Sequence, residues 1–264
     1  MEKTASKVAW ITGASSGIGE ELAKQLAAKG FSLVLSARNT SKLEALRHSL
    51  PQPENHLVLG LDLEHSENVA ELTDEVVKRF GKIDFLYNIG GLSQRAEAGS
   101  TPIEVDRKIM EINYFGTVAL TKAVLPVMRR QQSGHIVVIS SIAGKFGFYL
   151  RSAYSASKHA LHGFFESLLL EEAKNNIHVT IACPGKINTP ISLSALNEKG
   201  ESHGVMDHNQ ETGMPVDACV RTLIRAVDKQ KKEVLIGNKE IKAVTVKRFF
   251  PRLFWKIIAK QSAT

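Results

Sequence analysis

Cysteines and long apolar runs are scarce in this sequence. Its 264 residues include two cysteines, Cys183 and Cys219, which are too few for a disulfide framework and do not have zinc-ligand spacing. We expect both to be buried thiols in a reducing compartment. No apolar run approaches the roughly 18 residues that span a bilayer, and residues 1–7 are polar instead of signal-like. These absences argue against a disulfide-rich secreted module and predict a cytoplasmic protein.

Acidic residues are scarce at one end of the chain. Residues 221–264 contain 12 Lys/Arg and 3 Asp/Glu, a net charge of +9, whereas the whole chain carries +7. Residues 1–220 are therefore slightly acidic. A nucleic-acid-binding domain presents a basic surface, so we expect no nucleic-acid partner. The basic C-terminal part needs an explanation of its own.

Seven short apolar runs alternate with segments of helical periodicity. This order predicts a single doubly wound, Rossmann-type α/β domain with a mainly parallel seven-stranded sheet and helices on both faces. Ligands of such sheets bind at the carboxyl ends of the strands. The predicted strands are residues 8–11, 31–35, 57–61, 83–89, 135–139, 179–183 and 233–236.

Several helix starts have sequence signatures. Residues 41–44 form a capping box that opens the second helix, and Ser66 caps the third. A long fourth helix begins at residues 101–104 and contains Asn113. Asparagine is a poor helix former, so its side-chain amide should have a specific role at this position. We further expect helices over 153–173 and 216–229, with at most a short helix near 191–196 in the polar stretch between them.

A glycine-rich turn separates the first strand from the first helix. Residues 12–19 read TGASSGIG, which is G-x-x-x-G-x-G and thus a variant of the dinucleotide-binding fingerprint. Glycines let the backbone approach a phosphate, and the helix N-terminus offers unpaired N–H groups to it. The alternative is a flexible turn without a ligand.

The end of the second strand indicates which dinucleotide is bound. An acidic residue about 20 positions beyond the glycine turn would hold the ribose 2′-hydroxyl of NAD. Ala37 occupies that position here, and Arg38 follows it. A guanidinium suits a 2′-phosphate, so we predict NADP. The alternative is a solvated arginine at a strand end.

Tyr154 and Lys158 are four residues apart in a predicted helix, so their side chains share one face. A phenol ionises near pH 10 in water, and a neighbouring ammonium lowers that pKa toward the working range. The pair is therefore a candidate proton-transfer device. Alone, such a spacing is also typical of a solvated helix face.

Six motifs in order resemble the short-chain dehydrogenase/reductase family over residues 6–237. Beside residues 12–19 and the Tyr154–Lys158 segment, they are Asp62-Leu63, Asn88-Ile89-Gly90, Asn113 with Ser141, and residues 184–189. One departure is Ile89, where the family usually has alanine. The resemblance implies an NADP-dependent oxidoreductase that transfers hydride between the nicotinamide and a carbonyl or secondary alcohol. The alternative is a catalytically idle NADP-binding sensor or scaffold.

The resemblance also implies roles for the catalytic residues. Tyr154 would be the general acid or base, while Lys158 would lower its pKa and hold the nicotinamide ribose. Ser141 would hydrogen-bond the substrate oxygen, with Ser140 as the alternative. Asn113 would hold a water in a proton relay, or else pack against a neighbouring backbone.

The cofactor site implied by the resemblance draws on most of the loops at the carboxyl edge. Asp62 would contact adenine, and Ile187 and Thr189 would orient the nicotinamide. The full set is Gly13, Ser15, Ser16, Gly17, Ile18, Gly19, Arg38, Asp62, Leu63, Asn88, Gly90, Tyr154, Lys158, Pro184, Ile187 and Thr189.

The nine histidines do not predict a metal site. His203 and His208 share a loop without partners at ligand spacing, which is typical of solvated histidines. We expect His159 and His162 to face solvent or a partner subunit.

The loops near the catalytic pair predict a lipophilic small-molecule substrate. Large apolar residues precede Tyr154 and recur in the polar stretch after Thr189, where they would surround the nicotinamide if the loop closes as a lid. They are Phe146, Phe148, Tyr149, Leu150, Ile191, Leu193, Leu196 and Met206. The family resemblance also implies a homodimer or homotetramer that pairs through the fourth and fifth helices.

The C-terminal extension, residues 238–264, is set apart from the catalytic domain, residues 1–237. Bulky apolar residues alternate with cations over 247–260, and we expect helical segments over 239–260 with a break near Pro251. Either protein or a membrane surface must cover so much apolar surface. We expect burial against the domain or a second subunit, with peripheral membrane contact as the alternative. The tail resembles that of the dehydrogenase/reductase member 7B-like subgroup.

Overall fold

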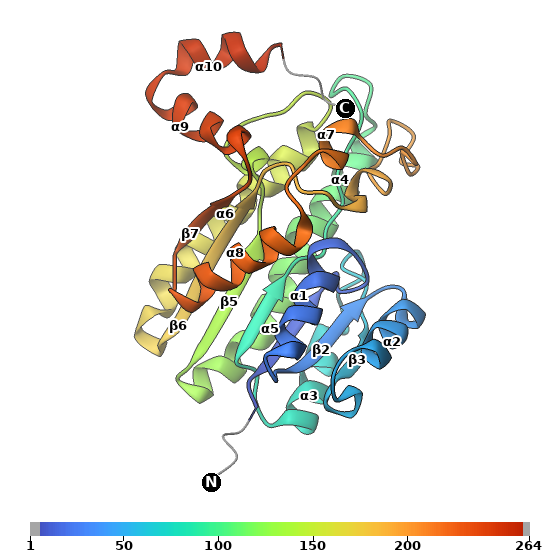
Figure 1. Ribbon diagram of the computed structural model, residues 1–264, viewed down its shortest axis with the longest axis vertical. Coiled ribbons are helices and arrows are strands. Elements are labelled where there is room, and N and C mark those ends of the chain that lie inside the picture. The colour runs from blue at the N-terminus through green and yellow to red at the C-terminus, as the bar shows by residue number, and fades with distance from the viewer. Residues whose placement is uncertain (1–5, 261–264) are drawn as a thin grey trace.

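A seven-stranded sheet runs through the protein in the computed structural model, which describes residues 6–260 (Figure 1). Its strand order is β3-β2-β1-β4-β5-β6-β7, and every neighbouring pair is parallel. The predicted single doubly wound domain is confirmed. The strands are β1 (Val8–Thr12), β2 (Ser32–Ala37), β3 (Leu57–Gly60), β4 (Phe85–Asn88), β5 (Gly134–Ile139), β6 (Ile177–Pro184) and β7 (Glu233–Ile236).

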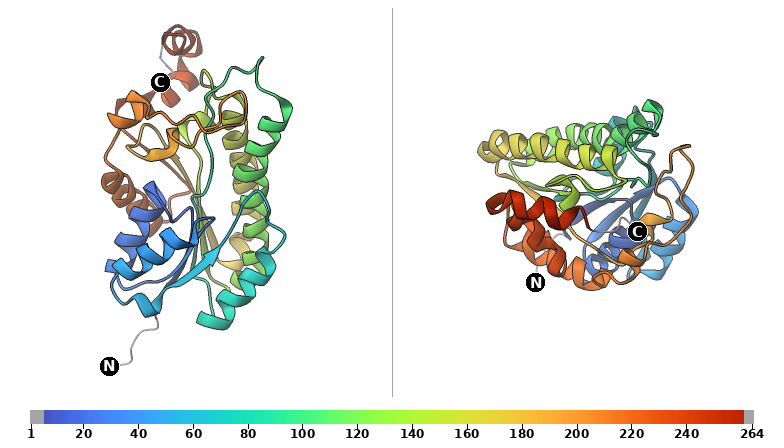
Figure 2. Two further views of the ribbon diagram at one scale, coloured as in Figure 1. Left: turned by 90° about the vertical axis from the view of Figure 1, so that its right-hand side faces the viewer. Right: turned by 90° about the horizontal axis from the view of Figure 1, so that it is seen from above.

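Helices cover both faces of this sheet (Figure 2). The helices are α1 (Gly17–Ala28), α2 (Thr40–Ser49), α3 (Val69–Phe80), α4 (Ile103–Met110), α5 (Gly116–Gln131), α6 (Ser152–Glu172), α7 (His208–Glu211), α8 (Val216–Asp228), α9 (Lys242–Phe249) and α10 (Pro251–Ile258). Helices α3 to α6 pack on one face, and α1, α2 and α8 on the other.

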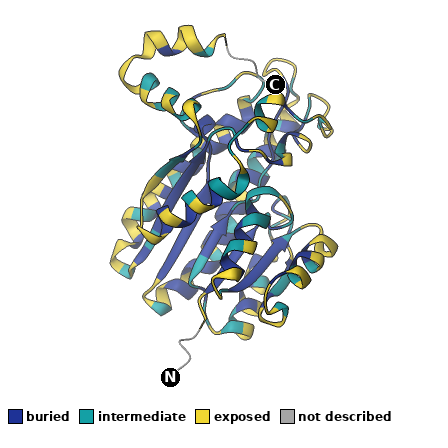
Figure 3. Cartoon of the chain, in the orientation of Figure 1, coloured by how far each residue is buried: buried dark blue, intermediate teal, exposed yellow. Residues whose placement is uncertain are grey.

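Alternate strand residues supply the two cores. In β1, Val8 and Trp10 join the core under α3 to α6, whereas Ala9 and Ile11 join the core under α1, α2 and α8. Because successive side chains of a strand point to opposite faces, a strand buried on both sides must be apolar throughout. The buried sheet in Figure 3 follows from this pattern.

Two predicted helix caps are wrong by a few residues. Helix α2 begins at Thr40, because the side chain of Asn39 already accepts a hydrogen bond from the Lys42 backbone N–H at 2.9 Å. The predicted box at residues 41–44 therefore lies inside the first turn. Helix α3 begins at Val69 with Asn68 in the cap position, and Ser66 contributes its backbone carbonyl to Val69 instead of a side-chain cap.

The predicted long fourth helix is divided into three parts. Between α4 and α5 lies a π-helical turn, Glu111–Phe115, which contains the fully buried Asn113. Such turns occur mostly as single bulges within α-helices, often at functional sites. Directly after it, a Cβ on Gly116 would overlap the backbone carbonyl of Leu63. The helix therefore approaches the end of β3 very closely at this point.

The polar stretch between β6 and α8 is mostly irregular. Where at most a short helix is predicted near 191–196, the structure has a three-residue helical turn at Pro190–Ser192, and the short helix α7 follows later in the stretch. Its root is tied to the residues after β7, since the Glu240 carboxylate accepts hydrogen bonds from the Lys186 N–H at 3.0 Å and the Asn238 N–H at 3.1 Å. The start of the stretch is thus held at the carboxyl edge of the sheet, next to the end of β7.

Helices α9 and α10 form the C-terminal hairpin, which projects from the carboxyl end of the sheet (Figure 1). The break expected near Pro251 is confirmed, since Phe250 leaves the helical region with φ −133° and ψ 60°. Phe254 is buried, and its ring centroid lies 4.9 Å from that of Phe146. Phe146 therefore packs beneath the hairpin and does not line a substrate pocket, which corrects the prediction.

Most of the other large apolar side chains of this hairpin are exposed (Figure 3). They are Phe249, Phe250, Leu253, Trp255 and Ile257. The domain itself thus covers only part of the apolar surface of the tail. Within residues 6–260, no helix is both long enough and apolar enough to cross a bilayer. Residues 1–5 of the predicted catalytic domain and residues 261–264 of the predicted C-terminal extension lie outside the described residues.

Candidate active site

A cavity of about 810 Å³ opens at the carboxyl edge of the sheet. Its first wall is the glycine turn between β1 and α1, where Gly13 and Gly17 have φ values of +67° and +55°. A Cβ on Gly13 would lie 2.9 Å from the backbone of Gly90, and one on Gly19 would overlap the Gly13 carbonyl oxygen. The turn therefore requires glycine at these positions and exposes its backbone to the cavity.

The N-terminus of α1 completes this wall. Its cap residue, Ser16, makes no side-chain cap hydrogen bond. The first N–H groups of a helix have no partner within the helix, and the helix dipole favours an anion there. This end of the cavity therefore suits a phosphate group.

The residues that follow β2 and β3 form another part of the cavity wall. Arg38 and Asp62 line the cavity together with Leu63. Asp62 is held in place because its Oδ1 accepts a hydrogen bond from the Glu64 N–H at 3.0 Å. A carboxylate and a guanidinium thus stand where these two strands end.

Most of the residues predicted to bind a cofactor surround this cavity, and four do not line it. Gly19, Asn88, Pro184 and Ile187 lie behind its wall. The lining residues of the predicted set are Gly13, Ser15, Ser16, Gly17, Ile18, Arg38, Asp62, Leu63, Gly90, Tyr154, Lys158 and Thr189.

Tyr154 and Lys158 lie on α6, and both are buried. The Lys158 ammonium is 5.7 Å from the centroid of the tyrosine ring and donates a hydrogen bond to the Ile139 carbonyl at 2.8 Å. Burial lowers the pKa of Lys158 to about 8. The predicted pair therefore shares one helix face at the bottom of the cavity.

Burial raises the pKa of the Tyr154 phenol, and three neighbours oppose this effect. They are the hydrogen bond with Ser141 and the positive charges of Arg151 and Arg95, each of which lowers the pKa. The cations that lower the pKa of the phenol in this structure are thus two arginines that the sequence did not suggest, instead of the predicted Lys158.

Tyr154 also lines a second cavity, of about 60 Å³. Ser141 lines it together with Phe148 and Ile191. Ser140 instead donates a hydrogen bond to the Lys158 backbone carbonyl at 3.0 Å. Of the two serines, Ser141 is therefore the one placed with Tyr154 beside the second cavity.

The amide of Asn113 binds a neighbouring backbone. Its Oδ1 accepts from the Leu92 N–H at 2.7 Å, and its Nδ2 donates to the Leu92 carbonyl at 2.9 Å and to Ser157 Oγ at 3.0 Å. These hydrogen bonds correspond to the alternative role for Asn113, in which its side chain packs against a neighbouring backbone instead of holding a water. They fix the turn after β4, where a Cβ on Gly91 would come within 3.5 Å of Lys158 Nζ.

His162 is buried, which corrects the expectation that it faces solvent or a partner. It lies one helical turn after Lys158, so its ring points toward the sheet, 3.1 Å from Ser140 Oγ. One imidazole nitrogen of His162 and one carboxylate oxygen each of Glu166 and Glu233 lie within 4.8 Å of one another, close enough to hold a metal ion. The Lys145 ammonium contacts His162 and Glu233, so a cation already occupies this group of acids.

Sequence reasoning missed a set of buried polar residues beside Tyr154. Gln94, Arg95 and Asp207 are almost fully buried, and Arg151 precedes α6. The available signal was the position of Gln94 and Arg95 in the loop that follows β4 at the carboxyl edge of the sheet. Asp207 gave no signal, because its partner is more than 100 residues away.

A doubly wound parallel sheet whose glycine turn, strand ends and Tyr154–Lys158 pair line one cavity defines a Rossmann-type oxidoreductase. Within this class, the chain belongs to the short-chain dehydrogenase family, which matches residues 7–200. The resemblance seen in the sequence is therefore confirmed.

Relatives cover nearly the whole chain. Dehydrogenase/reductase SDR family member 7B of Mus musculus is 42% identical over 258 residues, which are 96% of this chain and 80% of that protein. Dehydrogenase/reductase SDR family protein 7-like of Drosophila melanogaster is 40% identical over 262 residues, 97% of this chain and 80% of that protein. The similarity to the 7B-like subgroup is thus confirmed.

Solved structures show the same fold. A short-chain dehydrogenase from Streptomyces avermitilis is 27% identical with a TM-score of 0.79, covering 97% of this chain and 98% of that chain. An alcohol dehydrogenase from the archaeon Thermococcus sibiricus, complexed with 5-hydroxy-NADP, is 27% identical with a TM-score of 0.74, covering 88% and 97%.

Proposed function

We propose that this protein is an NADP(H)-dependent oxidoreductase that interconverts a carbonyl and a secondary alcohol, with Tyr154 as general acid or base. The observation that carries this proposal is that the buried Tyr154 lines both cavities, the first together with Lys158 and the second together with Ser141. The positive-φ glycines and the uncapped α1 N-terminus fit the phosphates of a dinucleotide. A bound nicotinamide supplies or accepts the hydride.

The side chains of this site would manage the proton and the substrate oxygen. The Ser141 hydroxyl would hydrogen-bond the carbonyl oxygen in the second cavity, and the Tyr154 hydroxyl would donate its proton to that oxygen in the reduction direction. Lys158, with its pKa lowered to about 8, would stabilise the phenolate that remains. Asn113 and Gly91 would keep the backbone of the turn after β4 from blocking the lysine.

Arg38 supports the choice of NADP. It lines the cavity after β2, where the ribose of a dinucleotide would lie. The relative from Thermococcus sibiricus was solved with 5-hydroxy-NADP, which is consistent with this choice. A guanidinium adds a charge-assisted hydrogen bond to a 2′-phosphate and gains nothing comparable from a 2′-hydroxyl.

Arg38→Ala should weaken NADPH binding by about 1.5–3 kcal/mol, roughly tenfold to a hundredfold. NADH binding should change little. Titration of each nucleotide by fluorescence or calorimetry measures both affinities. Lys42→Ala is the matched control, because Lys42 is exposed on α2 and does not line the cavity. Equal affinity of the unchanged protein for NADPH and NADH would contradict the assignment.

The substrate is proposed to be lipophilic. Ile142, Phe148 and Ile191 support this proposal, because they line the second cavity beside the reacting hydroxyls. Polar residues complete its lining, among them Arg151 and Lys186. A panel of ketones, aldehydes, steroids and acyl ketones, followed by NADPH oxidation, tests the function and the substrate class together. Preference for small charged sugars would contradict the substrate class. Cofactor binding without turnover on any member would favour the idle sensor.

The protein is proposed to act in the cytoplasm as a homodimer or homotetramer. Exposed Phe115 and Leu170 on the α5 and α6 side support pairing through those helices. On the C-terminal hairpin, Leu253 and Ile257 are exposed beside several cations and would meet a second copy, with an anionic membrane surface as the alternative.

Leu253→Glu combined with Ile257→Glu should lower the oligomeric mass measured by light scattering. Both side chains are half-exposed, so the thermal stability of the domain should remain close to that of the unchanged protein. Sedimentation of the unchanged protein with anionic vesicles, and loss of that sedimentation in the variant at constant mass, would instead favour membrane contact.

A further inference from the structure

The loop after β4 passes between the start of α6 and the polar stretch that follows β6. On one side, the Arg95 N–H donates to the Leu196 carbonyl at 2.8 Å. On the other side, the Ala96 N–H donates to the Leu150 carbonyl at 3.2 Å. Three segments that are distant in sequence therefore meet in one place beside Tyr154.

Gln94 caps the helix that carries the tyrosine. The residue before α6, Arg151, makes no side-chain cap hydrogen bond. Instead, the fully buried Gln94 accepts hydrogen bonds through Oε1 from the Ala153 N–H at 2.9 Å and the Tyr154 N–H at 3.3 Å. A helix start needs such acceptors. The position of Tyr154 therefore depends on the loop after β4.

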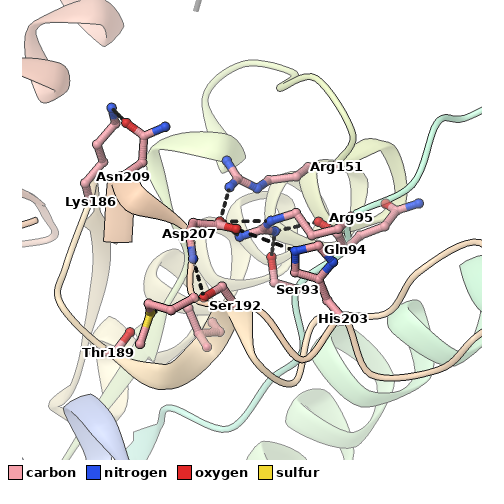
Figure 4. A network of polar contacts seen from close by, with 12 residues as sticks. Ser93, Gln94, Arg95, Arg151, Lys186, Thr189, Ser192, His203, Asp207 and Asn209 are labelled. Carbon is pink, nitrogen blue, oxygen red and sulfur yellow. Dashed lines mark hydrogen bonds and ion pairs between the residues drawn. The ribbon is translucent and has the colours of Figure 1, made fainter. Parts of the chain in front are cut away.

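Arg95 connects the same loop to the segment that precedes α7 (Figure 4). Its Nε donates to Asp207 Oδ2 at 2.9 Å, and the same oxygen accepts from Arg151 at 3.2 Å. The side chains of Arg95 and Asp207 are almost completely buried. One carboxylate thus joins a cation from the loop after β4 to a cation at the start of α6.

Asp207 also fixes its own segment. Its backbone N–H donates to Ser192 Oγ at 3.2 Å, which ties residue 207 to the turn after Thr189. Ile191 in that turn lines both cavities. Asp207 is therefore linked through Ser192 to the turn that supplies part of the wall of both cavities beside Tyr154.

The two arginines act on the Tyr154 phenol as well as on the Asp207 carboxylate. They share one aspartate, and both lower the pKa of the Tyr154 phenol. The charged or titratable side chains around this phenol in the described part of the chain are Arg95, Arg151, Lys158, Lys186, His203 and Asp207.

We propose that Arg95, Arg151 and Asp207 are positioning residues for the reaction: together they clamp the substrate-covering segment to the start of α6 and keep positive charge beside the Tyr154 hydroxyl. This inference rests on the proposed role of Tyr154. A buried ion triad costs desolvation energy that well-packed apolar side chains would avoid. A role in positioning gives a reason for its presence next to the reacting group.

Titration of Tyr154 followed by tyrosinate absorbance tests the charge part of this proposal without a substrate. The signal of Tyr154 is obtained by subtracting the titration of Tyr154→Phe in each background. Arg95→Gln removes a cation, so the Tyr154 pKa should rise. Asp207→Asn removes the anion, so the pKa should fall. A purely structural role would move neither pKa, or both in the same direction, and would overturn the proposal.

The kinetic part of the test uses the full-length protein with NADPH and a ketone that it reduces. Asp207→Asn should lower kcat on the order of tenfold to a hundredfold through misplacement of the covering segment, with NADPH affinity little changed. Unchanged kcat in the folded variant would overturn the positioning role. If the unchanged protein reduces no ketone, the proposed function fails, while the tyrosinate titration still decides the electrostatic claim.

Two further variants separate positioning from folding. Arg95→Met combined with Arg151→Met and Asp207→Leu removes the whole ion triad, so no member of it loses only its partner, and the variant should remain folded, yet its kcat should fall as in Asp207→Asn. The control is Glu172→Gln, which breaks the ion pair of buried Glu172 with Arg129 near the other end of α6. It should lower thermal stability and leave the Tyr154 pKa and kcat unchanged. A folded triple variant with full kcat would contradict the proposal.

Discussion

Tyr154→Phe should lower turnover by about 10²–10⁴-fold, the contribution of a positioned general acid. The substitution removes only the hydroxyl, and the ring would remain buried in the wall between the two cavities. Because the glycine turn and Arg38 lie elsewhere in the cavity, NADPH affinity should change little. Steady-state kinetics with a ketone substrate and a separate nucleotide titration measure the two quantities.

Tyr149→Phe is the matched control for this experiment. Tyr149 is exposed, and its hydroxyl donates a hydrogen bond to Glu97 at 2.9 Å instead of facing a cavity. This control should retain full turnover. If Tyr154→Phe also retained it, another group would have to be the acid. A parallel loss of NADPH binding would show that the hydroxyl serves the cofactor instead of the proton.

Gly19→Ala should abolish productive cofactor binding and destabilise the fold by about 1–3 kcal/mol, the usual cost of overpacking. Alanine is normally the better helix former. Here its Cβ would overlap the carbonyl oxygen of Gly13, and neither backbone can move without opening the turn. Chemical denaturation and NADPH titration measure the two effects.

Gly163→Ala is the same glycine-to-alanine change, but we expect it to have the opposite effect on stability. Gly163 lies within α6, and a Cβ there would meet nothing within 4 Å. This variant should be stabilised by about 0.5–1 kcal/mol. If Gly19→Ala behaved like Gly163→Ala, the close contact with Gly13 would not be important in solution.

Local patterns predicted the parts of the fold that depend on neighbours in sequence. The run at Glu233–Ile236 is the strand as the structure has it, because valine, leucine and isoleucine suit a half-buried strand at the edge of the sheet. The glycine turn and the Tyr154–Lys158 pair likewise follow from spacing. The helix caps were less certain, since Asn39 and Ser41 are both good capping residues and packing decides between them.

Contacts between distant segments could not be predicted in this way. Nothing near Asp207 in the sequence shows that it will meet Arg95. The burial of Phe146 depends on Phe254 in the C-terminal hairpin, and that of His162 on the rotation of α6 against the sheet. The Asp207–Arg95 contact and the burial of Phe146 and His162 all depend on tertiary packing, which cannot be inferred from the residues nearby in sequence.

The carboxylate of Glu240 restricts how this chain could be redesigned. It accepts from the N–H of Lys186, which begins the loop that leads to Thr189 and the cavity. It also lies so close to Gly185 and Gly237 that a Cβ on either glycine would collide with it. A chimera that exchanges the tail after Ile236 must therefore keep both glycines and an acceptor at residue 240, or the cofactor loop would lose its anchor together with the tail.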